Sequence, residues 1–201
     1  MKVKICGLNP ARDVQICIDL KVNYLGFVFY ENSPRNVNLS NIKLLSNYNK
    51  KRTDFVAVTV NPSDEFIKNN LLGKFDFIQL HGSETCERIK EIKDMGFKVI
   101  KAIKIKEEQD IDKYKDFDDA DIILFDTPGM EQSIEFPQNL ISKLPIGEKY
   151  AIAGSISENN VEKIYKLGVN FFDLSSSLES QLGYKDHLKI KSFINKINEL
   201  K

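Results

Sequence analysis

The sequence has no excess of either charge and no long apolar run, and these absences exclude several classes of protein. Lys+Arg and Asp+Glu number 29 each among 201 residues. The net charge therefore gives no reason to expect binding to nucleic acid or to an anionic membrane. No apolar run approaches the roughly 18 residues that a membrane helix needs. With 42% hydrophobic and 29% charged residues, the composition predicts one soluble globular domain with a sizeable core.

Cysteine is also scarce, and its three positions show no spacing typical of metal ligands. Cys6, Cys17 and Cys86 form an odd, sparse set, which indicates reduced thiols. No signal-like segment follows Met1. We therefore expect a cytoplasmic protein, with Cys17 and Cys86 inside helical patterns as core thiols.

What the sequence does contain is a repeated pattern of short apolar runs that end at turn residues. The clearest run is 122–126, which ends on Asp126 before Thr127-Pro128-Gly129 and an irregular connection. A continuous run of this length is typical of a strand buried on both faces. Strands are predicted at 3–6, 24–29, 55–60, 75–80, 99–105, 122–126, 150–153 and 171–174.

Helical patterns separate these runs. They begin at Asn9-Pro10 and then cover 39–45, 63–72, 83–96, 107–114, 136–144, 157–167 and 186–200, with Ser63, Ser83 and Ser157 as expected N-caps. Eight alternating strand and helix units predict an α/β protein with a parallel sheet. We expect a single closed (β/α)8 barrel over residues 1–201. An open doubly wound sheet would need a Gly-rich loop after the first strand, and residues 6–10 are not one.

Polar and small residues gather where these strands end, which is the edge of such a barrel that carries the active site. They are Cys6, Arg35, Gln79, His81, Asp126, Gly154, Ser155, Ser175 and Ser176. Small residues after the seventh and eighth strands suit a phosphate, because backbone N–H groups can approach it there. Taken singly, Asp126 fits a turn or helix cap better than catalysis, and Gly154 fits a plain turn equally well. His81 is also compatible with a hydrogen-bonded packing residue.

Lys4 lies two residues before Cys6, so both side chains point to the same face of the first strand. A lysine inside the barrel needs a charged partner. The first and eighth strands are neighbours in a closed barrel, and Asp173 lies at a similar level. We therefore predict a Lys4–Asp173 ion pair. Its role is either structural or electrostatic toward Cys6.

These residues also occur in motifs that resemble the phosphoribosylanthranilate isomerase family of tryptophan biosynthesis, over nearly the whole chain. The motifs are Lys4-Ile5-Cys6-Gly7, residues 26–30 with Ser33-Pro34-Arg35, Val60-Asn61, Gln79-Leu80-His81-Gly82, residues 100–102, Leu124-Phe125-Asp126, Ala153-Gly154, Asn160-Val161, residues 173–176, and Gly183 with Lys185-Asp186. The resemblance implies a TIM barrel that carries out an Amadori rearrangement of N-(5-phosphoribosyl)anthranilate to the carboxyphenylamino deoxyribulose 5-phosphate.

The resemblance also implies roles for individual residues. Asp126 matches the general acid and Cys6 the general base, while Arg35 matches the residue that pairs with the anthranilate carboxylate. Gly154-Ser155 and Ser175-Ser176 match the phosphate loops, and Gln79 and His81 lie at the substrate rim. No metal or organic cofactor is implied, and the protein is expected to be a monomer or homodimer. As an acid, Asp126 must begin protonated, so we predict that desolvation raises its pKa.

The sequence departs from the family pattern in its phosphate loops. Ser155 and Ser177 stand where the family usually has glycine, which predicts less backbone freedom and a weaker phosphate site. One alternative is therefore a non-catalytic phosphosugar-binding relic of the same fold. Another is the related isomerase of histidine biosynthesis, although that chemistry uses an aspartate in the place of Cys6. A protein-interaction scaffold has no specific support. The retained Cys6 and Asp126 favour an active enzyme.

Overall fold

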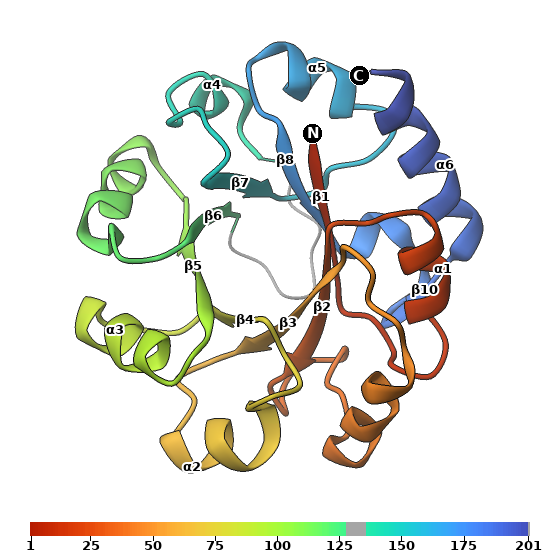
Figure 1. Ribbon diagram of the computed structural model, residues 1–201. Coiled ribbons are helices and arrows are strands. Elements are labelled where there is room, and N and C mark those ends of the chain that lie inside the picture. Colours follow the sequence, from red (N-terminus) through yellow and green to blue (C-terminus); the bar gives the residue numbers. More distant parts are fainter. Residues whose placement is uncertain (128–135, 201) are drawn as a thin grey trace.

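The computed structural model describes residues 1–127 and 136–200, which form a closed barrel of eight parallel strands in chain order (Figure 1). The predicted barrel is confirmed, and four strands fall on the predicted residues. The strands are β1 (Lys2–Cys6), β2 (Tyr24–Phe29), β3 (Asp54–Thr59), β4 (Phe77–Leu80), β5 (Lys98–Lys104), β6 (Ile122–Asp126), β7 (Tyr150–Ala153) and β8 (Phe171–Leu174). The predicted irregular connection over 128–135 lies outside the described residues.

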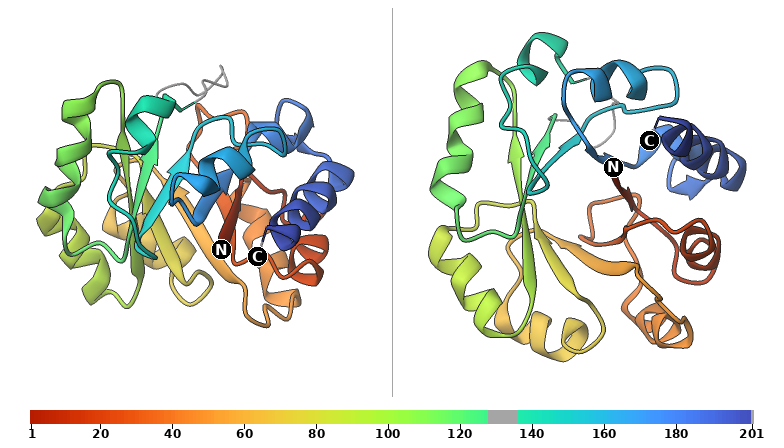
Figure 2. Two further views of the ribbon diagram at one scale, coloured as in Figure 1. Left: turned by 90° about the horizontal axis from the view of Figure 1, so that it is seen from above. Right: turned by 45° about the horizontal axis from the view of Figure 1, so that its top comes forward.

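Helices surround the strands, and Figures 1 and 2 show them as an outer layer around the barrel. They are α1 (Val14–Asp19), α2 (Asp64–Phe66), α3 (Cys86–Asp94), α4 (Gln138–Ile141), α5 (Val161–Lys166) and α6 (His187–Glu199). Two predicted α-helices are instead 3-10 helices, η1 (Leu39–Asn47) and η3 (Glu108–Phe117), while α2 continues into a π-helical turn, η2 (Ile67–Leu71). No helix in this part of the chain is long and apolar enough to cross a membrane.

The helix starts were only partly predictable. Ser63 caps α2 as expected, because its side chain accepts a hydrogen bond from the Phe66 N–H. The other two expected caps were wrong. Thr85, not Ser83, caps α3. The Ser157 N–H donates to the Asn160 side chain, and α5 begins only after Asn160. In both cases a second polar residue nearer the first helical turn makes the local hydrogen bond.

The barrel has two apolar layers, one between strands and helices and one inside the sheet. Three aromatic rings fill the inside near the strand starts. The Tyr24 ring lies 5.1 Å from that of Phe171 in a stacked arrangement and 5.5 Å from that of Phe77 edge-on. This end of the barrel is packed shut, which leaves the opposite end, where the strands finish, available for a site.

A short hairpin after β8 was not predicted. The 3-10 turn η4 (Ser176–Leu178) leads into β9 (Glu179–Gln181), which pairs antiparallel with β10 (Tyr184–Lys185). Two strands this short carry almost no apolar alternation, so the sequence pattern does not reveal them. The pairing places Lys185 opposite Glu179.

Two cysteines were expected to lie in the core. Cys17 is fully buried, and burial raises the pKa of its thiol to about 12. The prediction of a core thiol was wrong for Cys86, which is only partly buried. Its thiol lies 3.3 Å from Asp119 Oδ2. Cys86 starts the first turn of α3, which faces solvent on one side.

Candidate active site

The ends of the barrel strands enclose a cavity of about 210 Å³. It is lined by all nine candidate site residues named from the sequence: Cys6, Arg35, Gln79, His81, Asp126, Gly154, Ser155, Ser175 and Ser176. Its other polar lining includes Tyr30, Thr59 and Thr127, which lie at or near strand ends and were not predicted as site residues. Across the described residues, no three His, Cys, Asp or Glu side chains are grouped as metal ligands would be.

Asp126 ends β6 and lies beside Lys104, the last residue of β5. Burial raises the pKa of the Asp126 carboxyl to about 7, and the negative charge of Asp173 adds to the effect. Lys4, Lys104 and a hydrogen bond from the Thr127 N–H oppose it. The predicted direction and cause are confirmed. A large share of Asp126 is therefore protonated near neutral pH, as an acid catalyst requires.

The predicted ion pair between Lys4 and Asp173 is also confirmed. Lys4 Nζ lies 2.7 Å from Asp173 Oδ2, and the two side chains are 2% and 5% exposed. Burial alone would lower the pKa of Lys4, but the charges of Asp173 and Cys6 outweigh it and raise the pKa. The ammonium therefore stays charged inside the barrel.

Cys6 ends β1, and its thiol lies against this ammonium. Burial raises the pKa of Cys6, while the positive charges of Lys4 and Lys185 act in the opposite direction. Gly26, the β2 neighbour of Cys6, makes the close packing possible. A Cβ at Gly26 would stand 3.1 Å from Cys6 Sγ and 3.2 Å from Lys4 Nζ. The two cations offset part of this effect in favour of the thiolate, but the pKa of Cys6 remains raised, because burial and the negative charge of Asp173 outweigh them.

Gln79 and His81 reach the cavity from β4 and the residue after it. Their side chains are in hydrogen-bond contact through Gln79 Nε2 and His81 Nε2. Burial, followed by the charge of Lys4, lowers the pKa of His81 to about 3. The imidazole is therefore neutral at physiological pH and can form hydrogen bonds without carrying a charge. Within the described chain, Gln79 Oε1 has no hydrogen-bond partner.

The loops after β7 and β8 differ in how their polar groups are used. Ser175 Oγ donates to the Cys6 carbonyl at 3.1 Å. Gly154 and Ser155 both have positive φ, +120° and +45°. Ser155 takes the left-handed conformation itself at a cost of roughly 1–2 kcal/mol, as expected where a serine replaces glycine, and the weaker phosphate site stays a prediction. Ser155 Oγ is buried without a hydrogen-bond partner in the described structure.

Ser155→Gly is expected to stabilise the unliganded protein by about 1 kcal/mol, because it removes both the strained φ and the unpaired hydroxyl. The same change is expected to raise KM about fivefold, because the phosphate predicted at this loop would lose the hydrogen bond from the Ser155 hydroxyl. Urea unfolding and steady-state kinetics measure the two effects. Ser155→Ala is the matched control, because it keeps the strain and loses the hydroxyl. A lower KM in Ser155→Gly would contradict this account.

Arg35 lies over the cavity mouth, where it is held by a residue that sequence reasoning missed. Its Nε and Nη2 donate to Glu179 Oε1 and Oε2 at 2.7 and 2.8 Å. Glu179 and Lys185 come from the unpredicted hairpin. Lys185 had already been noted in the motif with Gly183 and Asp186, and that spacing was the only available signal for it.

A carboxyl acid, a thiol beside two ammonium groups and two small-residue loops thus face one cavity. The fold and this arrangement define a (β/α)8 enzyme of the acid–base class. The family model described as N-(5'phosphoribosyl)anthranilate (PRA) isomerase matches residues 3–196.

Individual relatives agree with the family match. N-(5'-phosphoribosyl)anthranilate isomerases are 33% identical in Legionella pneumophila (strain Corby), over 98% of this chain and 97% of that protein, and 37% identical in Petrotoga mobilis, over 100% and 99%. A solved phosphoribosyl anthranilate isomerase in complex with reduced 1-(o-carboxyphenylamino)-1-deoxyribulose 5-phosphate has a TM-score of 0.83 at 26% identity, covering 99% of each chain. The chain therefore belongs to the PRA isomerase family, the aldose–ketose isomerases of tryptophan biosynthesis.

Proposed function

We propose that Asp126 is the general acid and Cys6 the general base of the isomerase reaction of this chain. The observation that carries the proposal is a carboxyl whose pKa is about 7, in the same cavity as a thiol that lies beside buried ammonium groups. Acid and base come from β6 and β1, which are not adjacent in the barrel. A sugar ring held between them meets one group on each side.

The proposed reaction begins with the proton of Asp126. Its transfer to the furanose ring oxygen breaks the bond between that oxygen and C1, and the lone pair of the anthranilate nitrogen forms the Schiff base. Cys6 then removes the proton from C2, which gives the enolamine, and tautomerisation yields the ketone. The positive Schiff base joins Lys4 and Lys185 in favouring the Cys6 thiolate at the step that needs it.

The two ends of the substrate are assigned to different loops. We assign the phosphate to Gly154-Ser155 and Ser175-Ser176, where Ser155 Oγ is an open hydrogen-bonding group. The anthranilate carboxylate is assigned to Arg35, because a guanidinium can offer paired donors to a carboxylate. Gln79 and His81 support the sugar between them by hydrogen bonding. The solved relative in complex with reduced 1-(o-carboxyphenylamino)-1-deoxyribulose 5-phosphate supports the binding of a phosphorylated ligand by this chain.

The test is isomerase turnover, followed by the loss of phosphoribosylanthranilate fluorescence. Cys6→Ala and Asp126→Asn are each expected to lower kcat by about 10²–10⁴-fold, the range for loss of a general acid or base. Cys86→Ala and Asp116→Asn are matched controls outside the cavity, and we expect them to keep wild-type turnover. A folded wild type without activity would instead favour the phosphosugar-binding relic.

A further inference from the structure

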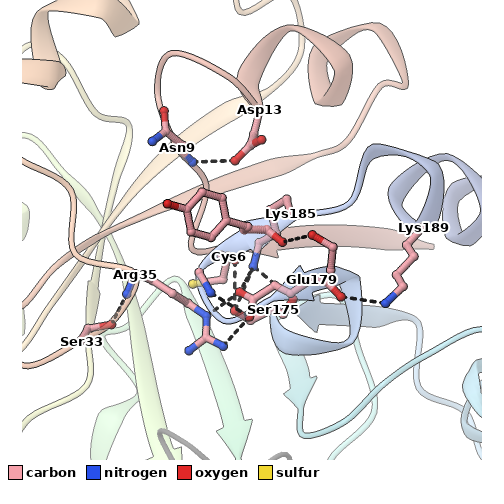
Figure 3. Close-up of polar contacts among 12 residues, drawn as sticks. Cys6, Asn9, Asp13, Ser33, Arg35, Ser175, Glu179, Lys185 and Lys189 are labelled. Carbon is pink, nitrogen blue, oxygen red and sulfur yellow. Dashed lines mark hydrogen bonds and ion pairs between the residues drawn. The ribbon is translucent and has the colours of Figure 1, made fainter.

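Three charged side chains from two loops form a buried cluster at the mouth of the cavity (Figure 3). Arg35 follows β2, while Glu179 and Lys185 belong to the hairpin after β8. Lys185 Nζ lies 2.7 Å from Glu179 Oε1, the oxygen that also accepts from Arg35 Nε. The Arg35, Glu179 and Lys185 side chains are 11%, 6% and 0% exposed. One carboxylate thus joins two cations away from bulk water.

The cluster leaves one edge of the Arg35 guanidinium available. Glu179 occupies the edge formed by Nε and Nη2, and within the described chain no hydrogen bond reaches Nη1. A guanidinium has two such edges, and the second is formed by Nη1 and Nη2. Arg35 lines the cavity, whereas Glu179 does not. The open Nη1–Nη2 edge therefore belongs to a side chain, Arg35, that lines the cavity.

Packing also holds the aliphatic part of the Arg35 side chain in place. A Cβ on Gly7, the residue after Cys6, would stand 2.5 Å from Arg35 Cδ. The side chain therefore runs directly over the Gly7 backbone, while Gly183 in the hairpin packs against the Pro34 carbonyl. With two cations around one carboxylate, the cluster keeps one positive charge in excess, which suits an anionic ligand group.

We propose that Glu179 is a positioning residue, which fixes Arg35 so that its Nη1–Nη2 edge meets the carboxylate of the substrate aromatic ring. The inference rests on the proposed function, since Arg35 receives that carboxylate there. Glu179 itself touches no substrate. With Glu179 in place, Arg35 offers a pre-oriented pair of donors at the mouth of the cavity. Without Glu179, Arg35 would be a flexible cation there.

The chemistry of the cluster suits this role. Burial would raise the pKa of Glu179, but hydrogen bonds from Arg35 and Lys185 outweigh it and hold the pKa at about 2. The Glu179 carboxylate therefore stays ionised at neutral pH. Lys185 also donates to the Ser175 carbonyl at 3.1 Å, and the Ser175 hydroxyl donates to the Cys6 carbonyl. The cluster is thereby tied to the strand that carries the base.

The test compares Glu179→Gln with Arg35→Ala and with the double variant, after circular dichroism confirms folding. We expect Glu179→Gln to raise KM about tenfold and to leave kcat within about twofold. In the Arg35→Ala background the same change is expected to add less than about twofold, because the residue to be positioned is gone. Glu179→Asp keeps the charge with a shorter reach and is expected to fall between wild type and Glu179→Gln.

Calorimetric binding separates this inference from the proposed function, because it needs no turnover. Two ligands are compared, the reduced product analogue and ribulose 5-phosphate, which lacks the carboxylated ring. Glu179→Gln is expected to weaken only the first by about tenfold. Equal weakening of both ligands, or the full tenfold effect in the Arg35→Ala background, would overturn the positioning role. A wild type that binds both ligands but lacks turnover would contradict the proposed function alone.

Discussion

Replacing Asp126 with asparagine is expected to make the protein more stable at pH 8 while it removes isomerase activity. The pKa of Asp126 is about 7 in the folded protein, against an ordinary value of 3.8. The folded state therefore binds this proton more tightly than the unfolded state, so stability falls as pH rises from about 4 to about 7. Above that range the buried charge costs up to about 4 kcal/mol, from a pKa difference of about 3 at 1.36 kcal/mol each. Asparagine keeps the shape without the charge.

Urea unfolding of the wild type and the Asp126→Asn variant at pH 4.5 and pH 8 measures this effect. The variant is expected to be more stable by about 2–4 kcal/mol at pH 8 and by less than about 1 kcal/mol at pH 4.5. Asp116→Asn on the exposed surface is the matched control and is expected to change stability by less than about 0.5 kcal/mol at either pH. An Asp126→Asn effect of the same size at both pH values would mean that ionisation of Asp126 is not its cause.

Lys4→Met is expected to destabilise the protein by about 3–5 kcal/mol, the usual effect of breaking a buried ion pair. Asp173 would then be a buried carboxylate without its cation, and its Oδ1 already has no hydrogen-bond partner among the described residues. The Asp126 and Asp173 charges also repel each other in this cavity. Removal of Lys4 takes away the positive charge that offsets both of them.

The double variant Lys4→Met/Asp173→Leu tests whether the cost comes from the unpaired charge. We expect it to recover most of the stability lost in Lys4→Met, because apolar replacements of a buried pair are often nearly neutral. Lys115→Met serves as the control, since Lys115 and Asp112 form an exposed pair in which both side chains are more than half exposed. Its expected effect is below about 0.5 kcal/mol. Asp173→Leu is measured alone as well. A double variant that loses as much stability as the two single variants together would contradict a direct interaction between Lys4 and Asp173.

The sequence was sufficient to place the barrel strands and the cavity residues. Runs such as 122–126 and 171–174 are buried on both faces, so continuous apolarity marks them against polar flanks. Once the strands are placed, closure of the barrel brings their ends to one edge. Cys6 and Asp126, which end two of these strands, are thereby predicted to face the same cavity. The Lys4–Asp173 pair was predictable for the same reason, since strand alternation and the closure of β8 onto β1 fix the register.

Features that depend on contacts between loops were not predictable in this way. The ion pair of Arg35 with Glu179 joins residues that are 144 apart in the chain, through a hairpin too short to show a pattern. The positive φ of Ser155 could not be predicted from residue type, because the surrounding fold imposes on this serine a conformation that favours glycine. The helix starts at Thr85 and Asn160 were decided by competing local hydrogen bonds.

Direct titration of the Asp126 carboxyl tests the central claim that burial at the end of β6 keeps this acid protonated. The measurement is ¹³C NMR of protein labelled at the aspartate carboxyl carbons, with Asp126→Asn used to assign the resonance. We predict a resonance that titrates with a pKa of about 7 in the wild type and is missing from the variant. A resonance that titrates near 3.8, the ordinary value for aspartate, would contradict the account, because Asp126 would then be ionised before the substrate arrives.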